Sequence, residues 1–414
     1  MKNFNYKLLS GLYYNRYDEY DEYLELYNKR IHSPEYVSLD FTIADSPAFF
    51  LETSELMKTV VEIARLDKEI AKLSALLPKI ALQQYINKCL IDEIVITNNI
   101  EGVYSTRKEI GEILDDLEGK SKNRFFGLVN KYAALQSKED LSINTSQDIR
   151  NLYDEMFLSE IREEDPKDVP DGQIFRKDHV DVVSATQRVI HHGAYPESEI
   201  IRSMDKAIKI LNAENIEPLF RIAIFHYLFG YIHPFYNGNG RLNRFISSYY
   251  LAHTLEPIMG YRLSYTIKEN INRYYKSFRI VNGKKNKGDI TPFIFTYLDF
   301  IKESSITLKE KLEEKANALK YYSKSLESLP YGNDDKYRTL YFYLLQAALF
   351  SEIGISTNDL LQYLQISRPT LQKRLRLLDE SCLLITMRRE TNKFYQLNLD
   401  KLPFKGQVPD SLER

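Results

Sequence analysis

The chain has 414 residues, enough for about two to four domains with a large core. Hydrophobic residues make up 43% and charged residues 28%, the ordinary composition of a soluble globular protein. The 56 Lys and Arg residues nearly balance the 58 Asp and Glu residues, which argues against a protein whose whole surface binds nucleic acid. The overall balance does not exclude a local basic patch.

The cysteines and the hydropathy pattern indicate a cytoplasmic protein. Cys89 and Cys382 lie far apart without metal-ligand or redox spacing, so we expect free thiols in a reducing compartment. The first residues lack an apolar core of signal-peptide length. No uncharged apolar stretch reaches the roughly 18 residues that a membrane-spanning helix needs, so no membrane span is expected.

Helical periodicity is common along the chain, and strand-like alternation is scarce. Apolar residues recur at spacings of three and four through 51–77, which predicts an amphipathic helix that ends near Pro78. A tyrosine-rich stretch at 13–27 predicts another helix, whose Tyr face packs rather than binds a ligand. Residues 146–163 and 197–213 predict two further helices.

A short hairpin is expected between those two helices, because Gly and Pro flank β-branched residues in the segment 168–199. Residues 217–231 are apolar nearly all round and predict a fully buried helix. A glycine-rich turn follows, and then another apolar helix at about 241–255. The fold class expected is therefore all-α, with a helical core and one small hairpin.

The sequence HPFYNGNGRLNR at 233–244 concentrates groups that suit an oligophosphate. The proline after His233 ends the buried helix, and the residues GNG at 238–240 tolerate positive φ, so that backbone N–H groups can converge. A helix that begins near Arg241 adds its positive dipole end and places Arg241 and Arg244 on one face. His233 could take a proton near neutral pH. Each feature alone is common, but their combination in so short a segment is not.

This segment resembles the Fic family motif, HPFx(D/E)GNGRxxR, at every defined position except Asn237. The resemblance extends over about 80–300 and implies the Fic fold, with the active-site loop between two central helices. It implies AMP transfer from ATP to a Ser, Thr or Tyr hydroxyl of a target protein. His233 would be the general base, and Phe235 would anchor the loop. The residues that would bind the nucleotide phosphates are Gly238, Asn239, Gly240, Arg241 and Arg244.

Asn237 stands where the family has the acidic residue that binds the Mg²⁺ bridging the phosphates. A neutral amide oxygen can serve Mg²⁺ or Mn²⁺ together with several waters, but Mg²⁺ prefers anionic oxygen. The resemblance therefore implies Asn237 as the metal ligand of a weakened or metal-shifted enzyme.

Two further segments take roles that the resemblance implies. Residues 176–195 would form a flap that aligns the target backbone by strand addition. Asn272 and Tyr275 would contact the adenosine, in a segment that also holds Asn270 and Tyr274. Core packing is an equal explanation for either tyrosine.

The segment TNNIEG at 97–102 resembles the Fic inhibitory pattern, (S/T)xxxE(G/N). Thr97 and Glu101 are four residues apart on one helix face, and Gly102 gives the helix a natural end. The resemblance implies that Glu101 pairs with Arg244 where the γ-phosphate should bind, so that ATP takes a pose unsuited to in-line attack. A simple helix C-cap is the other explanation. The same glutamate could support removal of AMP from a target by water.

The C-terminal residues resemble a winged helix-turn-helix. Residues 356–380 predict two helices around a tight turn, and strands are expected at 384–387 and 394–397 around a turn at 390–392. The segment 366–393 holds three acidic residues and seven basic ones, namely Arg368, Lys373, Arg374, Arg376, Arg388, Arg389 and Lys393. Its net charge of about +4 permits DNA binding. A protein-interaction or dimerisation unit is a nearly equal alternative.

We therefore expect an N-terminal helical region at 1–80, a Fic catalytic domain at 81–300, a connecting helix and linker at 301–335, and a winged-helix domain at 336–414. The leading function is a self-inhibited protein adenylyltransferase that uses ATP with Mg²⁺ or Mn²⁺ and modifies a target protein or itself. The alternative is a nucleotide-sensing, DNA-binding transcriptional regulator with a weak or inactive Fic domain. A homodimer is a further possible assembly.

Overall fold

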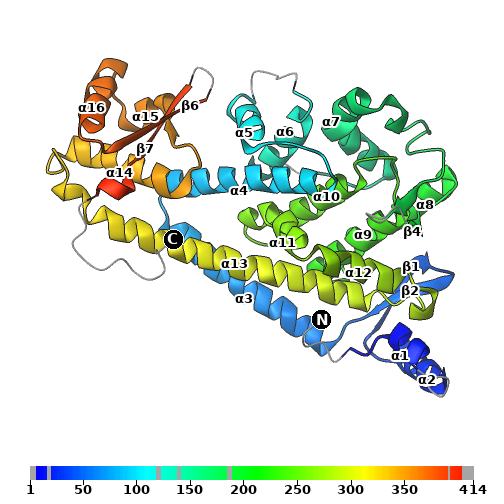
Figure 1. The fold of residues 1–414 in the computed structure, drawn as a ribbon. Coiled ribbons are helices and arrows are strands. Elements are labelled where there is room, and N and C mark those ends of the chain that lie inside the picture. Colours follow the sequence, from blue (N-terminus) through cyan, green and yellow to red (C-terminus); the bar gives the residue numbers. More distant parts are fainter. Residues whose placement is uncertain are drawn as a thin grey trace. The chain divides into compact units, whose positions relative to one another are not determined.

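The computed structural model describes residues 6–15, 20–117, 123–137, 141–183, 189–389 and 392–402. Within these ranges the chain is mostly helical, with three small antiparallel sheets (Figure 1). The expected all-α fold class is confirmed. A search of the described helices finds none that combines the length and apolar character needed to cross a membrane.

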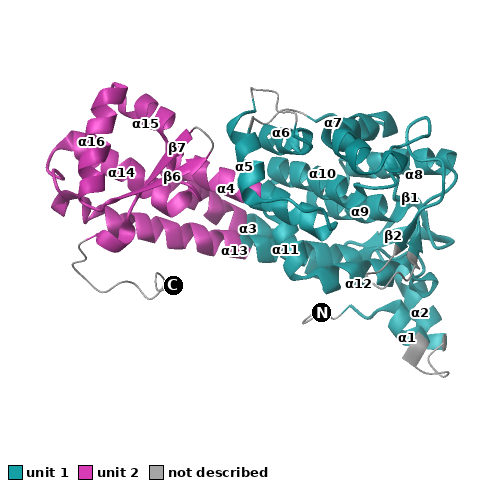
Figure 2. Ribbon diagram, turned by 45° about the horizontal axis from the view of Figure 1, so that its top comes forward, with its two compact units in different colours: residues 1–65, 92–305 teal, residues 66–91, 306–414 magenta. Residues whose placement is uncertain are grey.

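The chain separates into two compact units, shown in different colours in Figure 2. Unit 1 comprises residues 1–65 and 92–305, and unit 2 comprises residues 66–91 and 306–414. Three helices are divided between the units: α3 (Ser54–Leu76), α4 (Lys79–Ile100) and α13 (Thr291–Ser323). Composition suggested contiguous regions, whereas unit 2 combines two segments that are distant in the sequence.

Unit 1 begins with two helices, α1 (Leu9–Asn15) and α2 (Tyr20–Ile31). A buried ion pair joins α2 to the segment just before α13, since Arg30 Nη1 lies 2.8 Å from Asp289 Oδ2. The hydroxyl of Tyr6 donates to the same carboxylate at 2.6 Å. The N-terminal helices are therefore fixed to the core of unit 1 by a buried polar contact.

A hairpin that sequence analysis missed follows these helices. β1 (Tyr36–Ile43) pairs antiparallel with β2 (Ser46–Leu51), and alternate residues of β1 are buried from Leu39 onward. The turn residues Ala44 and Asp45 have φ angles of 46° and 67°. Two positive φ angles at the turn are usually marked by Asn-Gly or Asp-Gly, so the Ala-Asp turn carried no recognisable signal.

The core of unit 1 is built around α9 (Pro218–Ile232) and α10 (Asn239–Thr254), which pack against each other. The predicted helices at 146–163, 197–213 and 217–231 are confirmed, and the one expected from 241 begins two residues earlier. The surrounding helices are α5 (Arg107–Asp115), α6 (Phe126–Ala134), α7 (Ser146–Glu164), α8 (Glu197–Leu211), α11 (Leu263–Glu269) and α12 (Ile271–Asn282).

The expected hairpin before α8 is present. β3 (Asp181–Val183) pairs antiparallel with β4 (Val189–His192). Residues 184–188, which the sequence places at the middle of the predicted flap, lie outside the described residues.

The described residues of unit 2 that follow α13 contain a three-stranded sheet and three α-helices. The elements are α14 (Asp335–Phe350), β5 (Ile355–Ser356), α15 (Thr357–Leu364), α16 (Arg368–Glu380), β6 (Leu384–Arg389) and β7 (Asn392–Leu397), with strand order β5–β7–β6. The Ser356 hydroxyl caps α15 by accepting the Asp359 N–H at 3.0 Å, and Pro369 opens α16. Residues 390 and 391 of the predicted turn lie outside the described residues.

Candidate active site

The loop between α9 and α10 is entered and left through residues with positive φ. His233 ends α9 at φ 52°, and its N–H still donates to Phe229 O at 2.9 Å. Gly238, at φ 79°, begins α10. Non-glycine residues with positive φ are uncommon and gather at functional sites, so the conformation of His233 marks the loop as more than a connection.

The side chain of Asn239 shapes this loop from inside. Its Oδ1 accepts the Phe235 N–H at 2.9 Å, and its Nδ2 donates to Phe235 O at 2.7 Å. The buried ring of Phe235 stacks on Tyr153 with a centroid distance of 3.8 Å and an interplanar angle of 9°. The prediction for Asn239 concerns its backbone N–H, and the side chain holds the loop in shape. The backbone N–H groups at the start of α10 are left for an anion.

His233 sits in an environment that keeps its imidazole neutral. Burial lowers the pKa of His233 to about 4, the Glu101 carboxylate opposes this shift, and Arg176 and His191 add to it. At neutral pH the ring therefore carries a free lone pair. This is the state that a general base requires.

Arg176 connects the hairpin to the loop, and sequence analysis gave it no role beyond the start of the flap. Its guanidinium is fully buried and donates to three backbone carbonyls: His233 O (3.0 Å), Asp178 O (2.5 Å) and Ala194 O (2.8 Å). Asp178 and Ala194 lie on either side of the β3–β4 hairpin. Because all three acceptors are backbone atoms, no residue pattern in the sequence could have indicated this contact.

The predicted brake residues lie against Arg244. Nε of Arg244 donates to Thr97 Oγ1 at 2.7 Å, and Nη2 donates to Thr97 O at 3.1 Å and to Glu101 Oε1 at 2.8 Å. α4 ends at Ile100, and Gly102 adopts φ 77° just beyond it. The helix end that the sequence predicted is thus present, and it presents a hydroxyl, a carbonyl and a carboxylate to one guanidinium.

Glu101 also covers the first turn of α10. A Cβ atom placed on Gly240 would collide with Oε1 of Glu101, so the carboxylate lies directly against the backbone at this glycine. The start of a helix carries a positive dipole end and unpaired N–H groups, which favour an anion. Glu101 therefore occupies the position that a phosphate would favour.

Arg241 is paired differently. Its Nη1 lies 2.6 Å from Glu160 Oε1 of α7, and both side chains have an exposed fraction of 0%. Burial raises the pKa of Glu160, and the Arg241 guanidinium opposes that shift. Among the described residues, Nε and Nη2 of Arg241 have no hydrogen-bond partner. Two buried donors are thus left for a further acceptor, which fits the predicted contact with phosphate.

The expected metal ligand Asn237 is engaged within the protein. Its Oδ1 accepts the Gly238 N–H at 2.6 Å, and its Nδ2 donates to Asp168 Oδ2 at 3.4 Å. Within the described ranges, no group of three or more His, Cys, Asp and Glu side chains could hold a metal ion. Mg²⁺ on a nucleotide commonly takes one or two protein carboxylates together with phosphate oxygens and water. One carboxylate beside the loop, that of Asp168, fits this requirement.

The predicted adenosine contacts divide into two groups. The phenol of Tyr275 is 42% exposed. Its pKa is raised by partial burial and further by the Glu101 carboxylate, so Tyr275 lies close enough to the site to interact with its charges. Asn272 is exposed on the same helix. Tyr274 is buried with its hydroxyl 2.7 Å from His226 Nε2, as core packing predicts.

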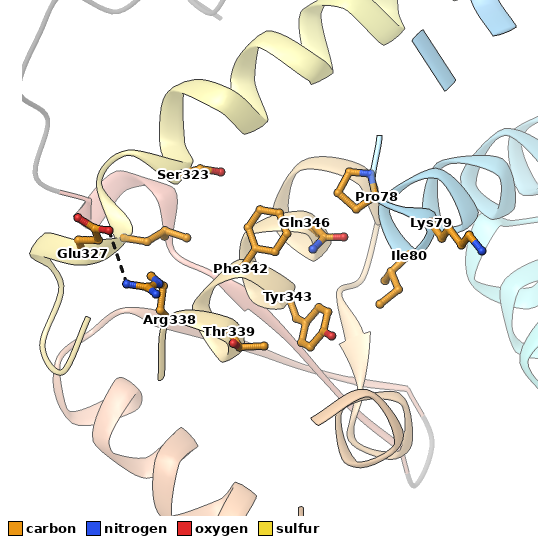
Figure 3. A pocket seen from close by; sticks show the side chains of 11 residues that line it. Pro78, Lys79, Ile80, Ser323, Glu327, Arg338, Thr339, Phe342, Tyr343 and Gln346 are labelled. Atoms are coloured by element: carbon orange, nitrogen blue, oxygen red, sulfur yellow. Dashed lines mark ion pairs between the residues drawn. The ribbon is translucent and has the colours of Figure 1, made fainter. Parts of the chain in front are cut away.

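A separate pocket of about 560 Å³ lies in unit 2, and none of the predicted site residues lines it. Figure 3 shows Phe342, Tyr343 and Gln346 of α14 around it, together with Arg338, which pairs with Glu327. The chemistry described above therefore belongs to the α9–α10 loop of unit 1.

Comparison with known proteins identifies the family of this loop. The Fic/DOC family profile matches residues 143–251, which include the motif at 233–244. Residues 143–251 of this chain form a Fic domain. The expected family membership is thereby confirmed, while the segment 97–102 lies outside the matched residues.

Two relatives of this Fic domain protein carry the name protein adenylyltransferase Fic. The one from Drosophila yakuba is 28% identical over 296 residues, which cover 66% of this chain and 54% of the relative. The one from Drosophila melanogaster is 28% identical over 297 residues, which cover 66% and 55%. The chain thus spans about half the length of the curated relatives it matches.

Solved structures that match this Fic domain protein include a Fic family protein from Desulfovibrio desulfuricans G20. It is 21% identical, and the match covers 90% of this chain and 100% of that chain with a TM-score of 0.48. Fic-1 from C. elegans is 20% identical, with coverage of 62% and 73% and a TM-score of 0.43.

Proposed function

We propose that this protein is a protein adenylyltransferase, which moves AMP from ATP to a hydroxyl of a target protein or of itself. The observation that carries the proposal is the arrangement around one loop. A neutral His233 lies at its start, and the buried Arg241 and Arg244 lie on the helix at its end. The name of the matched relatives, protein adenylyltransferase Fic, agrees with this chemistry.

The proposed reaction is an in-line displacement at the α-phosphorus. The target hydroxyl oxygen bonds to the α-phosphorus as His233 takes the hydroxyl proton, and the bond to the bridging oxygen of pyrophosphate breaks. The start of α10 and the free donors of Arg241 would neutralise the charge that moves to the leaving group. A bound Mg²⁺ or Mn²⁺ beside Asn237 would add positive charge at the phosphates.

We further propose that Glu101 inhibits this activity. Its carboxylate takes one N–H group of Arg244 and lies against Gly240, where the γ-phosphate would bind. ATP that enters under these conditions would be displaced from the in-line pose. Since the Glu101 side chain is 27% exposed, it can leave without unfolding the core. The same carboxylate could position water for removal of AMP from a modified protein.

The test is labelling with α-³²P-ATP in Mg²⁺ or Mn²⁺. We expect weak self-labelling of the wild-type chain, strong self-labelling of Glu101→Gly, and none of the double variant Glu101→Gly, His233→Ala. Equal labelling of the single and double variants would reject His233 as the base. A γ-labelled ATP control must leave the protein unlabelled, because the γ-phosphate departs with pyrophosphate.

Unit 2 favours a second candidate function, DNA binding. Its order of a helix, a short strand, two helices and a hairpin is that expected of a winged helix-turn-helix. Five of the seven predicted basic residues are exposed, namely Arg368, Lys373, Arg376, Arg388 and Lys393. Arg374 is only half-buried and packs over the Tyr337 ring. Exposed cations on α16 and the hairpin suit phosphate contacts.

The same hairpin also supports the protein-interaction alternative. Ile385 and Met387 on the edge strand β6 are 36% and 37% exposed. Mobility-shift titrations of the full chain with duplex DNA at 50 and 200 mM salt distinguish the two alternatives. DNA binding predicts loss of affinity with salt and a further loss in Lys373→Glu. No shift at either salt concentration would reject DNA binding and favour a protein partner.

A further inference from the structure

The amide of Asn237 is poorly placed to act as the metal ligand of the proposed reaction. Its oxygen already accepts the Gly238 N–H at 2.6 Å, and its nitrogen points to Asp168 Oδ2 at 3.4 Å. An amide that bound a metal through Oδ1 would compete with the N–H group that starts α10. The orientation therefore favours a different role for Asn237, that of a hydrogen-bond donor to a neighbouring carboxylate.

Asp168 is held beside the loop by the turn in which it lies. It ends the short 3₁₀ helix Pro166–Asp168, whose first turn is capped by the Asp165 side chain through the Lys167 N–H at 3.0 Å. The Asp168 N–H donates to Asp165 O at 3.0 Å. This turn follows directly on α7, the helix that also carries Glu160. The position of the Asp168 carboxylate is thus set by the same helix that holds Arg241.

The carboxylate of Asp168 has unused coordination capacity. Within the described residues its side chain makes one hydrogen bond, to Asn237, and no ion pair. The group is half-buried, so it is partly accessible from solvent. A carboxylate offers two oxygens with about four lone-pair sites, of which this contact uses one. The group is therefore both positioned and free to bind a cation.

We propose that Asp168 supplies the protein carboxylate for the nucleotide-bound Mg²⁺, and that Asn237 orients it. Asn237 then does not bind the metal itself but donates a hydrogen bond to the carboxylate that does, as such groups commonly do at metal sites. The anionic oxygen that Mg²⁺ prefers comes from outside the loop motif. This inference rests on the proposed function, because the cation is the one that accompanies ATP.

The test is a binding measurement that does not depend on turnover. Calorimetric titration of α,β-methylene-ATP into the full-length Glu101→Gly protein is run with Mg²⁺ and with EDTA. We expect Mg²⁺ to tighten nucleotide binding, and Asp168→Asn to lose most of that gain in affinity. Binding in EDTA should stay unchanged in this variant.

Two further variants separate metal binding from a purely structural contact. Asp171→Asn removes another carboxylate at the loop, which accepts the Tyr236 hydroxyl at 2.9 Å, and should retain the gain from Mg²⁺. The exchange variant Asp168→Asn, Asn237→Asp returns the carboxylate to residue 237 and should restore the gain. Electron paramagnetic resonance can measure the affinity of Mn²⁺ for the same nucleotide complex. This affinity should be low in Asp168→Asn and should be retained in Asp171→Asn and in the exchange variant.

Other outcomes would overturn the inference. If Asp168→Asn keeps the full gain from Mg²⁺, Asp168 is not the ligand. If Asp168→Asn weakens nucleotide binding equally in Mg²⁺ and in EDTA, the contact between Asp168 and Asn237 only stabilises the loop and does not serve metal binding. If no variant binds the nucleotide under either condition, the proposed function fails together with this inference, which distinguishes that failure from the first two.

Discussion

Arg241 and Arg244 lie one turn apart on the same helix, and both are fully buried, but their partners differ. Arg241 pairs with Glu160, whose exposed fraction is 0%, and retains two donors that have no partner among the described residues. Arg244 is bound by Thr97 through two contacts and by Glu101, whose side chain is 27% exposed. The first pairing is enclosed by the core, whereas the second is accessible at the end of α4.

This difference indicates two uses of the same residue type. An enclosed pair cannot exchange partners without leaving a buried charge, so Arg241 is a permanent part of the site. The Glu101 carboxylate is accessible, so a competing anion can take its place on Arg244 while Thr97 stays bound. The N-terminal part of α10 thus carries one cation with a fixed partner, Arg241, and one whose partner can be exchanged, Arg244.

The largest effect is expected from breaking the enclosed pair. Glu160→Ala should lower the free energy of unfolding by about 3–5 kcal/mol, because it leaves Arg241 buried without a counter-charge. Urea denaturation measures this loss. The control is Glu155→Ala on the same helix, where the exposed pair with Lys131 contributes about 1 kcal/mol or less. Equal losses in the two variants would show that the Arg241 pair is not enclosed in solution.

A second effect concerns Glu93, a buried carboxylate of α4, the helix that ends just before Glu101. Glu93 accepts both the N–H and the hydroxyl of Ser264, and burial raises its pKa to about 7. The folded state then binds more protons than the unfolded state between about pH 4.5 and 7, so stability falls as the pH rises through this range. The loss should reach about 3 kcal/mol. Unfolding of Glu93→Gln at pH 5 and pH 8 should show a smaller difference than that of the wild type.

A third effect concerns Arg244 and the hydroxyl of Thr97 that holds it. Thr97→Val keeps the shape of the side chain but removes the oxygen that accepts Arg244 Nε at 2.7 Å. An unsatisfied buried donor on a charged group should cost about 1.5–3 kcal/mol. Thr97→Ser retains the hydroxyl and should cost less. If Thr97→Val is as stable as Thr97→Ser, the hydroxyl does not hold the guanidinium.

The sequence predicted those parts of the molecule that depend on neighbouring residues. The positive φ at 238, the end of α4 shortly before Gly102 and the helices at 146–163 and 217–231 each follow from local residue types. The contact of Glu101 with Arg244 was implied by the family resemblance, and the structure has it. The two contacts of Thr97 with Arg244 were not predicted.

The missed features depend on contacts between distant parts of the chain. The guanidinium of Arg176 binds backbone carbonyls in the described part of the chain, and Glu160 pairs with Arg241 across 81 positions of sequence. Asp168 lies next to Asn237 because a turn after α7 brings it there. Segment 66–91 joins unit 2 by long-range packing, which composition does not reveal. Local periodicity contains no information about such pairings.

The smallest effect on stability is expected at Glu101, where the effect on activity should be large. Glu101→Gln keeps the shape of the side chain and removes its charge. Because Thr97 still binds Arg244 and water reaches residue 101, the loss in unfolding free energy should be smaller than that of Thr97→Val.

Self-labelling of Glu101→Gln with α-³²P-ATP should nevertheless rise above that of the wild type, because the amide cannot compete with phosphate for the guanidinium as a carboxylate does. Denaturation and labelling of the same preparation measure both quantities. If Glu101→Gln loses as much unfolding free energy as Glu160→Ala and labelling does not increase, the pair of Glu101 and Arg244 is structural, like the pair of Glu160 and Arg241. A small loss with increased labelling means that residue 244 is the exchangeable cation, since the carboxylate then opposes nucleotide binding far more than it supports the fold.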